Sequence, residues 1–289
     1  MSKLDRISIL YDIYRAILKD PRITMLDIHK TVSSYKSRTT TIDLVEWGRE
    51  NQIITGPFLY CNAHARVTLV KGAANPLKEF QKVKNDPSVT YAVLLCGEYS
   101  LLKVTRGGEE RGPVLTYINI ILPQFNGKEM IAIDDITEKG KLPEDPYPES
   151  WDDMDWKVYF TMGDPSLPFL QVGKKLDVSY MTVKRHYEKI VNDCKVLMGF
   201  FPRGYKTYSQ LSLIFKTEYE IGIKKALEQL NRSSYIWKFD DHMILFLFGN
   251  DQNKMCETFQ EMEENGIIHD LHVSIPTRNY TPIPEVFLC

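Results

Sequence analysis

The most constraining feature of the sequence is an internal repeat. Residues 19–32, "KDPRITMLDIHKTV", align without a gap with residues 163–176, "GDPSLPFLQVGKKL". Three further pairs of segments match in the same order: "QIITGPF" with "KVLMGFF", "RVTLVK" with "QLSLIFK", and "PLKEFQKVKN" with "GIKKALEQLN". Any one match can arise by chance, but four in order predict two copies of one folding unit.

Composition marks the border between the copies. Residues 137–150, "TEKGKLPEDPYPES", contain three prolines and no apolar periodicity, which is typical of a linker. Each copy divides into an all-helical front, roughly 4–58 and 151–200, and a back in which strands and helices alternate, roughly 65–136 and 208–279. The predicted modules are 1–64, 65–136, the linker 137–150, 151–207 and 208–289.

The helical front of the second copy predicts a helix-turn-helix. "FLQVGKKL" has the pattern of a short helix, and Ser179 is placed to cap a longer helix, "YMTVKRHYEKIVND". At 100° per residue, Val183, Tyr187 and Ile190 fall on one stripe, continued by Cys194, so we expect this stripe to face the core. The opposite side is polar and basic, which suits the major groove of DNA.

A solvated basic surface is the competing interpretation of this helix. Lys184 and Glu188 have an i,i+4 spacing that stabilises a helix without any partner. The turn before the helix nevertheless favours a DNA-recognition helix. The predicted DNA-binding residues are Ser179, Tyr180, Met181, Thr182, Lys184, Arg185, Glu188, Lys189, Arg203 and Lys206 in the second copy, with Lys36 and Arg38 in the first.

The corresponding helix of the first copy, within "SSYKSRTTTIDLVEWGREN", lacks a narrow apolar stripe. Its apolar residues Ile42, Val45 and Trp47 point in several directions. We therefore expect this helix to be buried on two sides, against another module or a second chain. Lys36 and Arg38 at its start can still hold a phosphate.

Composition limits the remaining function classes. The net charge of −2 gives no overall attraction to nucleic acid, so DNA binding has to come from a local concentration of positive charge. Apolar runs such as "HMILFLFG" are far shorter than the roughly 20 residues that span a bilayer. The five cysteines form no C-x-x-C pair, which argues against a zinc ribbon and a disulfide framework. We expect a cytoplasmic protein with reduced thiols, no metal, no cofactor and no membrane partner.

Two stretches resemble the Lrp/AsnC family of transcriptional regulators, and the resemblance covers nearly the whole chain as two tandem copies. "LDVSYMTVKRHYEKIVNDCKVLMGF" is similar to the family's Leu-x-Val-Ser-x-x-Thr-Val segment and its Val-Leu-x-Gly ending. "VTYAVLLCGEYSLLKV" is similar to the hairpin of its regulatory domain, with Gly97 and Tyr99 present and Ser100 where an acid is usual. The residues that carry the first match are Leu176, Val178, Ser179, Thr182, Val183, Val196, Leu197 and Gly199.

The resemblance implies an α+β fold in which each copy has a helix-turn-helix, winged-helix-like module followed by a ferredoxin-like βαββαβ regulatory module. It also implies double-stranded DNA as partner, an amino acid or other small effector at Gly97 and Tyr99, and a homo-oligomer. The sequence departs from the family pattern at two places. In the second copy "FDDHM" replaces a glycine turn, and in the first copy "RGGEERGP" stands where the second helix is expected. We interpret "RGGEERGP" as a turn and not a phosphate loop. In the second copy we assign strands 211–215, 235–239, 243–248 and 268–275, and helices 222–230 and 254–265.

The sequence thus predicts a sequence-specific DNA-binding regulator and not an enzyme. One alternative is an enzyme of the siroheme decarboxylase type, whose members pair two such units around a tetrapyrrole and use basic and histidine side chains. Arg203 and Lys206 in "FPRGYKTY", with His186 and His242 for proton transfer, fit that alternative, although its arginine-rich and histidine strand motif is missing. The other alternative is a protein-interaction scaffold with degenerate helix-turn-helix units.

Overall fold

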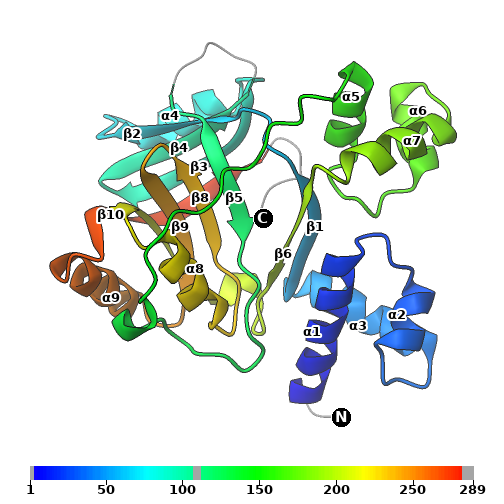
Figure 1. Ribbon diagram of the computed structural model, residues 1–289, viewed down its shortest axis with the longest axis horizontal. Helices are drawn as coiled ribbons and strands as arrows, with labels where there is room; N and C mark the ends of the chain where they lie inside the picture. Colours follow the sequence, from blue (N-terminus) through cyan, green and yellow to red (C-terminus); the bar gives the residue numbers. More distant parts are fainter. Residues whose placement is uncertain (1–2, 107–111, 282–289) are drawn as a thin grey trace.

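The computed structural model describes residues 3–106 and 112–281, and it places two helical units beside a large antiparallel sheet (Figure 1). The first copy contains α1 (Lys3–Lys19), α2 (Met25–Thr31), α3 (Arg38–Glu50), β1 (Ile54–Tyr60), β2 (Arg66–Lys71), α4 (Pro76–Val83), β3 (Val89–Gly97), β4 (Tyr99–Thr105), β5 (Leu115–Ile120) and the 3-10 turn η1 (Ile133–Asp135). The second contains α5 (Asp153–Thr161), α6 (Phe169–Leu176), α7 (Tyr180–Ile190), β6 (Lys195–Phe200), the 3-10 turn η2 (Tyr205–Thr207), β7 (Ser209–Thr217), α8 (Glu220–Glu228), β8 (Tyr235–Phe239), β9 (His242–Gly249), α9 (Gln252–Glu264) and β10 (Ile268–Tyr280). No helix in these two ranges is both long and apolar enough to cross a membrane.

A pair of strands joins the two three-helix units. β1 and β6 run antiparallel, with Tyr60 opposite Lys195. Phe200 on β6 is fully buried and completes the core of the first unit, whose largest buried side chain is Tyr14. The prediction that the fronts 4–58 and 151–200 are all-helical is therefore wrong at their ends, which are the strands β1 and β6. A short apolar run fits a strand as well as a helix, and here each copy supplies the partner strand of the other.

The backs of the two copies form one continuous sheet of eight strands, in the order β2-β4-β3-β10-β7-β9-β8-β5. β10, the last strand of the second copy, pairs with β7 of its own copy and with β3 of the first. β5, the last strand of the first copy, pairs with β8 of the second. The regulatory-type modules therefore pair within one chain, an arrangement that the sequence left open.

The sheet curls until its two ends meet. Val114, just before β5, forms an antiparallel bridge with Arg66 on β2, and the backbone N–H of Leu115 donates to the carbonyl of Ala65 (2.8 Å). The curl also brings Tyr91 on β3 against Trp237 on β8, with ring centroids 5.2 Å apart, although three strands separate β3 from β8 in the sheet. The concave face is thus the lining of a barrel-like interior.

Alternation along the strands separates this interior from the helical layer. Ile214 on β7 faces the interior, whereas its neighbours Leu213 and Phe215 pack under α8 and α9. α4 covers β3 and β4 of the first copy through the buried Phe80. Many interior side chains are aromatic: Tyr60, Tyr91, Tyr99, Phe201, Tyr205, Tyr208, Tyr235, Trp237, Phe239, Phe246 and Phe248.

The elements assigned to the second back module are confirmed, and β10 extends beyond the predicted 268–275 to Tyr280 because its end pairs with β3. In the first copy, β4 ends at Thr105 and β5 begins at Leu115. The turn predicted for "RGGEERGP" falls largely on residues 107–111, which lie outside the described residues.

Residues 137–150, predicted as a linker, pack along the second copy. The backbone N–H of Leu142 donates to Oε2 of Glu220 (2.7 Å). The buried carboxylate of Asp145 accepts the N–H of Ile118 (3.0 Å) and pairs with Lys195. This segment therefore fastens β5, β6 and α8 together.

Candidate functional site

The second helix-turn-helix has the predicted geometry. The Ser179 hydroxyl caps α7 by accepting the N–H of Thr182 (3.1 Å), and Val183, Tyr187 and Ile190 are buried. Cys194 lies beyond the helix and is only partly buried. The predicted DNA-binding face consists of exposed residues: Tyr180, Met181, Lys184, Arg185, Glu188 and Lys189, with Thr182 half-buried.

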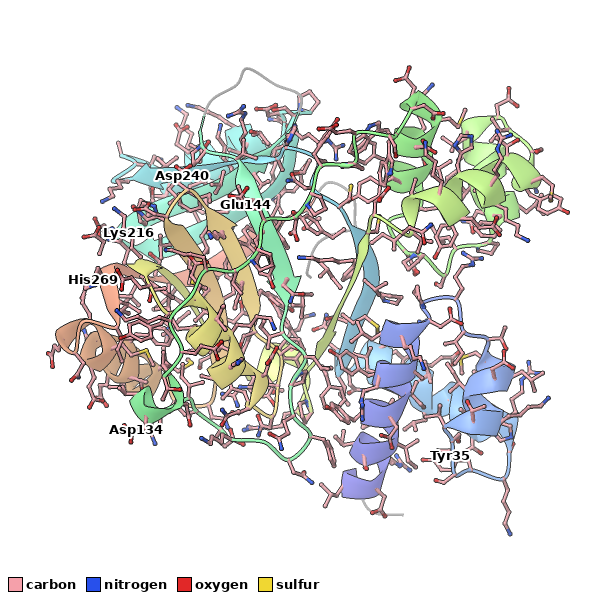
Figure 2. The ribbon with its side chains drawn as sticks, in the orientation of Figure 1. Tyr35, Asp134, Glu144, Lys216, Asp240 and His269 are labelled. Atoms are coloured by element: carbon pink, nitrogen blue, oxygen red, sulfur yellow. The ribbon has the colours of Figure 1, made fainter. Side chains whose placement is uncertain are left out.

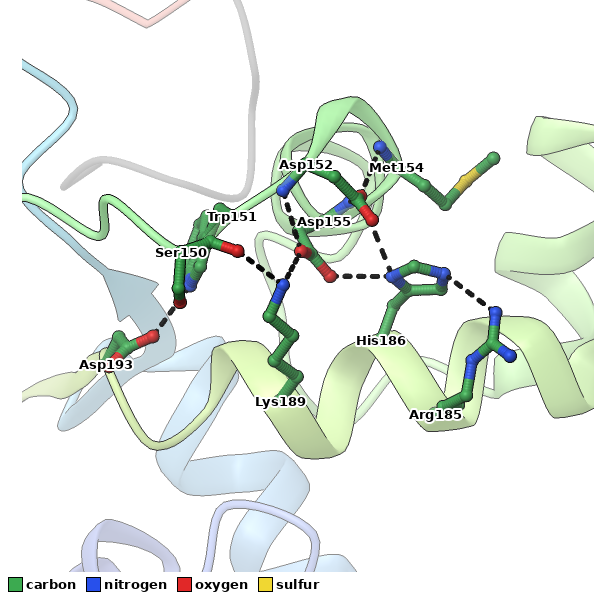
Figure 3. Close-up of polar contacts among 9 residues, drawn as sticks. All are labelled: Ser150, Trp151, Asp152, Met154, Asp155, Arg185, His186, Lys189 and Asp193. Carbon is green, nitrogen blue, oxygen red and sulfur yellow. Dashed lines mark hydrogen bonds and ion pairs between the residues drawn. The ribbon is translucent and has the colours of Figure 1, made fainter.

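Part of that face holds the unit together (Figure 3). Asp155 on α5 has no exposed side-chain surface. Its Oδ1 accepts the Nδ1–H of His186 (2.6 Å), and its Oδ2 pairs with the ammonium of Lys189. Lys189 also donates to the carbonyl of Ser150 (2.7 Å), and an Arg185 guanidinium N–H donates to Nε2 of His186 (3.4 Å). Lys189 and His186 are thus engaged in tying α7 to α5.

The same cluster contains potential metal ligands. Asp152, Asp155 and His186 place three ligand atoms within 4.8 Å of one another. The Lys189 ammonium already neutralises Asp155, and Asp152 caps α5 by accepting the N–H groups of Met154 and Asp155. An internal ion network accounts for all of these contacts.

The other predicted residues lie apart from α7. Lys36 and Arg38 are exposed at the start of α3. Gly97 and Tyr99 form the β3–β4 turn, which packs on β10: Gly97 is opposite Ser274, and the ring of Tyr99 meets His272 edge-on. The effector site and the homo-oligomer stay predictions.

The remaining histidines form no cluster in the described part of the chain. His242 stacks on Phe239 with ring centroids 5.1 Å apart. His269 is exposed at the start of β10, opposite Lys216 at the end of the neighbouring strand β7 (Figure 2). His272 donates through Nδ1 to Glu98.

A cavity of about 340 Å³ opens at one end of the barrel-like interior, a size within the usual range for small-molecule sites. We call it the pocket. Its walls come from the segment around η2 and from β3, β7, β8, β9, β10 and the start of α9, so both copies contribute. The lining residues are Tyr91, Val93, Tyr205, Lys206, Tyr208, Ser209, Gln210, Tyr235, Phe246, Phe248, Gln252, Ile275, Pro276, Thr277, Arg278 and Asn279.

The floor of the pocket is aromatic, and its basic groups are exposed. Phe248 lies at the centre, with its ring centroid 5.0 Å from that of Tyr235 and 5.2 Å from that of Tyr205. Lys206 and Arg278 are exposed residues of the lining, so their cationic ends are available to a ligand. The pocket therefore combines a flat apolar surface with positive charge.

The tyrosine hydroxyls of the pocket keep their protons at neutral pH. Burial raises the pKa of Tyr91 and of Tyr235 above the ordinary tyrosine value. Burial also raises the pKa of Tyr208, although the nearby guanidinium groups of Arg232 and Arg203 favour its ionised form. These groups are therefore neutral hydroxyls and not phenolates.

The segment that carries Lys206 is held by the first copy. The N–H of Phe201 donates to the carbonyl of Ile53 (2.7 Å), and the N–H of Tyr205 donates to that of Gln52 (2.9 Å). Between them, Arg203 donates to Oδ1 of Asn250 (2.6 Å). Of the two residues of "FPRGYKTY" singled out from the sequence, Lys206 thus lines the pocket and Arg203 braces its edge.

Comparison with known proteins finds similar solved structures but no similar sequence. No protein-family model and no curated protein sequence matches the chain. The crystal structure of the siroheme decarboxylase NirDL has a similar fold, with a TM-score of 0.56 and 12% identity over 100% of this chain and 95% of that chain. NirDL in co-complex with an iron-uroporphyrin III analogue also matches, with a TM-score of 0.53 and 11% identity over 98% of this chain and 93% of that one.

This comparison corrects the prediction of a DNA-binding regulator that is not an enzyme. Both solved structures are of an enzyme, so the siroheme decarboxylase alternative agrees with them better. The comparison shows a fold shared with NirDL and does not confirm an Lrp/AsnC regulator. A helix-turn-helix is a packing unit that persists when function changes, and sequence pattern alone cannot tell a DNA-reading unit from a structural one.

Proposed function

We propose that this protein is an enzyme that removes carboxyl groups from the acidic side chains of an iron tetrapyrrole of the siroheme type. The observation that carries the proposal is the aromatic and basic pocket, found in a chain with the fold of NirDL. Because the sequence identity to NirDL is only 12%, the proposal has to be supported by the residues that line the pocket of this chain.

The lining of the pocket fits such a substrate. A tetrapyrrole is a flat aromatic ring bearing several carboxylates. Its ring can stack on the tyrosine and phenylalanine side chains around Phe248. Lys206 and Arg278 can pair with carboxylates, and Arg278 can do so through two parallel hydrogen bonds.

The pocket also offers what a decarboxylation requires. In this reaction the bond between the methylene carbon and the carboxylate carbon breaks, carbon dioxide leaves, and the methylene carbon gains a proton to become a methyl group. Burying the carboxylate against Phe248 would remove water that stabilises its charge. The protonated hydroxyl of Tyr208 is a candidate donor of the new proton.

Binding and turnover test this proposal. Iron-uroporphyrin III added to the purified protein should change its absorption spectrum on binding, and siroheme incubated anaerobically should lose carbon dioxide, as measured by mass spectrometry. Lys206→Met and Arg278→Met should each weaken binding about tenfold, which corresponds to about 1.4 kcal/mol. Lys184→Met, on the exposed face of α7, is the matched control and should bind like the wild type. Tetrapyrrole binding that both pocket variants leave unchanged would exclude this pocket as the site.

A further inference from the structure

A second, smaller cavity lies on the far side of Tyr91 from the pocket. We call it the chamber. It has a volume of about 40 Å³ and lies between the sheet interior and α5. Tyr91 lines both cavities, so one side chain separates them. The other lining residues of the chamber are Tyr60, Cys61, Ala63, Ala65, Thr90, Val104, Arg106, Ile118, Tyr159, Phe160 and Trp237.

Among the described residues that line the chamber, Arg106 is the only charged one. Its guanidinium lies 3.5 Å from the centroid of the Phe160 ring, which covers one of its faces. Among the residues that the structure describes, none places a carboxylate within ion-pair distance of it. Burial lowers the pKa of Arg106 from its ordinary value, as expected for a cation that is partly removed from water without an anion beside it. Such a charge is costly unless a ligand or partner compensates it.

Trp237 provides a second polar group without a partner. The side chain is only 1% exposed, and its indole N–H has no hydrogen-bond acceptor within the described ranges. A buried N–H donor without an acceptor is unusual in proteins, because burial removes its hydrogen bond to water without replacing it. Two residues of the chamber lining, Arg106 and Trp237, therefore each carry a polar group that lacks an acceptor.

We propose that the chamber is a binding site for a carboxylate group, held by the guanidinium of Arg106 and the indole N–H of Trp237. The volume fits this ligand, since about 40 Å³ is space for about three water molecules, and a carboxylate has three heavy atoms. The apolar remainder of the lining strengthens both hydrogen bonds by excluding water. The carboxylate belongs either to an acidic side chain of the tetrapyrrole, which rests on the proposed function, or to a free small acid.

Nuclear magnetic resonance of the full chain tests the chamber without the tetrapyrrole. The chain has four tryptophans, so a ¹⁵N-tryptophan sample gives few indole signals, and Trp237→Phe identifies the signal of Trp237. Sodium acetate should shift that signal saturably, and sodium chloride at the same ionic strength should not. Arg106→Met should abolish the shift, and Arg106→Lys, which keeps the charge but loses the planar fork, should weaken acetate binding at least about tenfold. Lys184→Met should leave it unchanged.

The remaining indole signals show whether each variant stays folded. A Trp237 signal that acetate does not shift saturably, or a shift of equal affinity in folded Arg106→Met and Arg106→Lys, overturns the proposal. Metal-free uroporphyrin III then distinguishes the two sources of the carboxylate. If it shifts the same signal and blocks acetate, the ligand is a tetrapyrrole side chain. If uroporphyrin leaves the signal unshifted while acetate shifts it, the chamber is a site for a free small acid, and the proposed function stands or fails by its own binding and turnover tests.

Discussion

At the scale of single residues, the backbone conformation of Gly204 positions the segment that brings Lys206 to the pocket. Its φ of +92° lies in the region that favours glycine, and a Cβ at this position would lie 2.5 Å from the carbonyl oxygen of Asn51. Gly204→Ala therefore has to displace the segment that carries Lys206. We expect it to lower the free energy of unfolding by about 2–3 kcal/mol in urea denaturation and to weaken tetrapyrrole binding.

Gly72 offers the matched control for this substitution. It also has a positive φ, +57°, but nothing lies within 4 Å of a Cβ added there. Gly72→Ala should therefore cost only the backbone preference, about 1 kcal/mol, and should not affect ligand binding. Equal losses of stability in Gly204→Ala and Gly72→Ala would show that the contact with Asn51 has no energetic effect.

At the scale of elements, Asp155 joins α5 to α7 and makes the second helical unit sensitive to acid. Burial opposes ionisation of this carboxyl, but hydrogen bonds from Lys189 and His186 outweigh it, so its pKa is lowered from the ordinary value. A lowered pKa in the folded state adds stability above the unfolded pKa of about 3.9, and this stability is lost as the pH falls through the folded value. Asp155→Asn leaves Lys189 without its counter-ion and should cost about 3 kcal/mol at pH 7.

The pH dependence distinguishes this ion network from ordinary packing. The difference in free energy of unfolding between wild type and Asp155→Asn, measured by urea denaturation, should shrink as the pH falls below about 4, because the wild-type carboxyl also becomes neutral. Asp153→Asn, on the exposed side of the same helical turn, should cost less than about 1 kcal/mol at any pH. A pH-independent difference for Asp155→Asn would contradict the role of its charge.

Elements were predictable from the sequence where the local pattern is sufficient. The alternation in β7 to β10 and the cap at Ser179 are local, and both were assigned correctly. β1 and β6 were missed because each is a short apolar run whose strand state depends on a partner in the other copy. The pocket was predictable only through Lys206, since Tyr91 and Arg278 reach it from strands that meet only when the sheet curls.

At the scale of the whole molecule, the two sequence repeats are not two independent domains. Each copy ends in a strand that pairs with the other copy, β5 with β8 and β10 with β3, and β1 pairs with β6. An isolated half would expose unpaired strand edges and the aromatic interior of the sheet. Both features favour aggregation over a folded monomer.

We therefore predict that residues 1–150 and 151–289, produced separately, do not fold, whereas the two halves produced together form a stable one-to-one complex. The interior that the halves share supplies the hydrophobic stabilisation that neither half can bury alone. Size-exclusion chromatography and thermal unfolding followed by circular dichroism measure this directly. A soluble monomeric half that unfolds cooperatively would show that each copy has a self-sufficient core. The strand exchange would then be a docking contact between domains, and the pocket, which needs Tyr91 from one half and Lys206 from the other, would form only on docking.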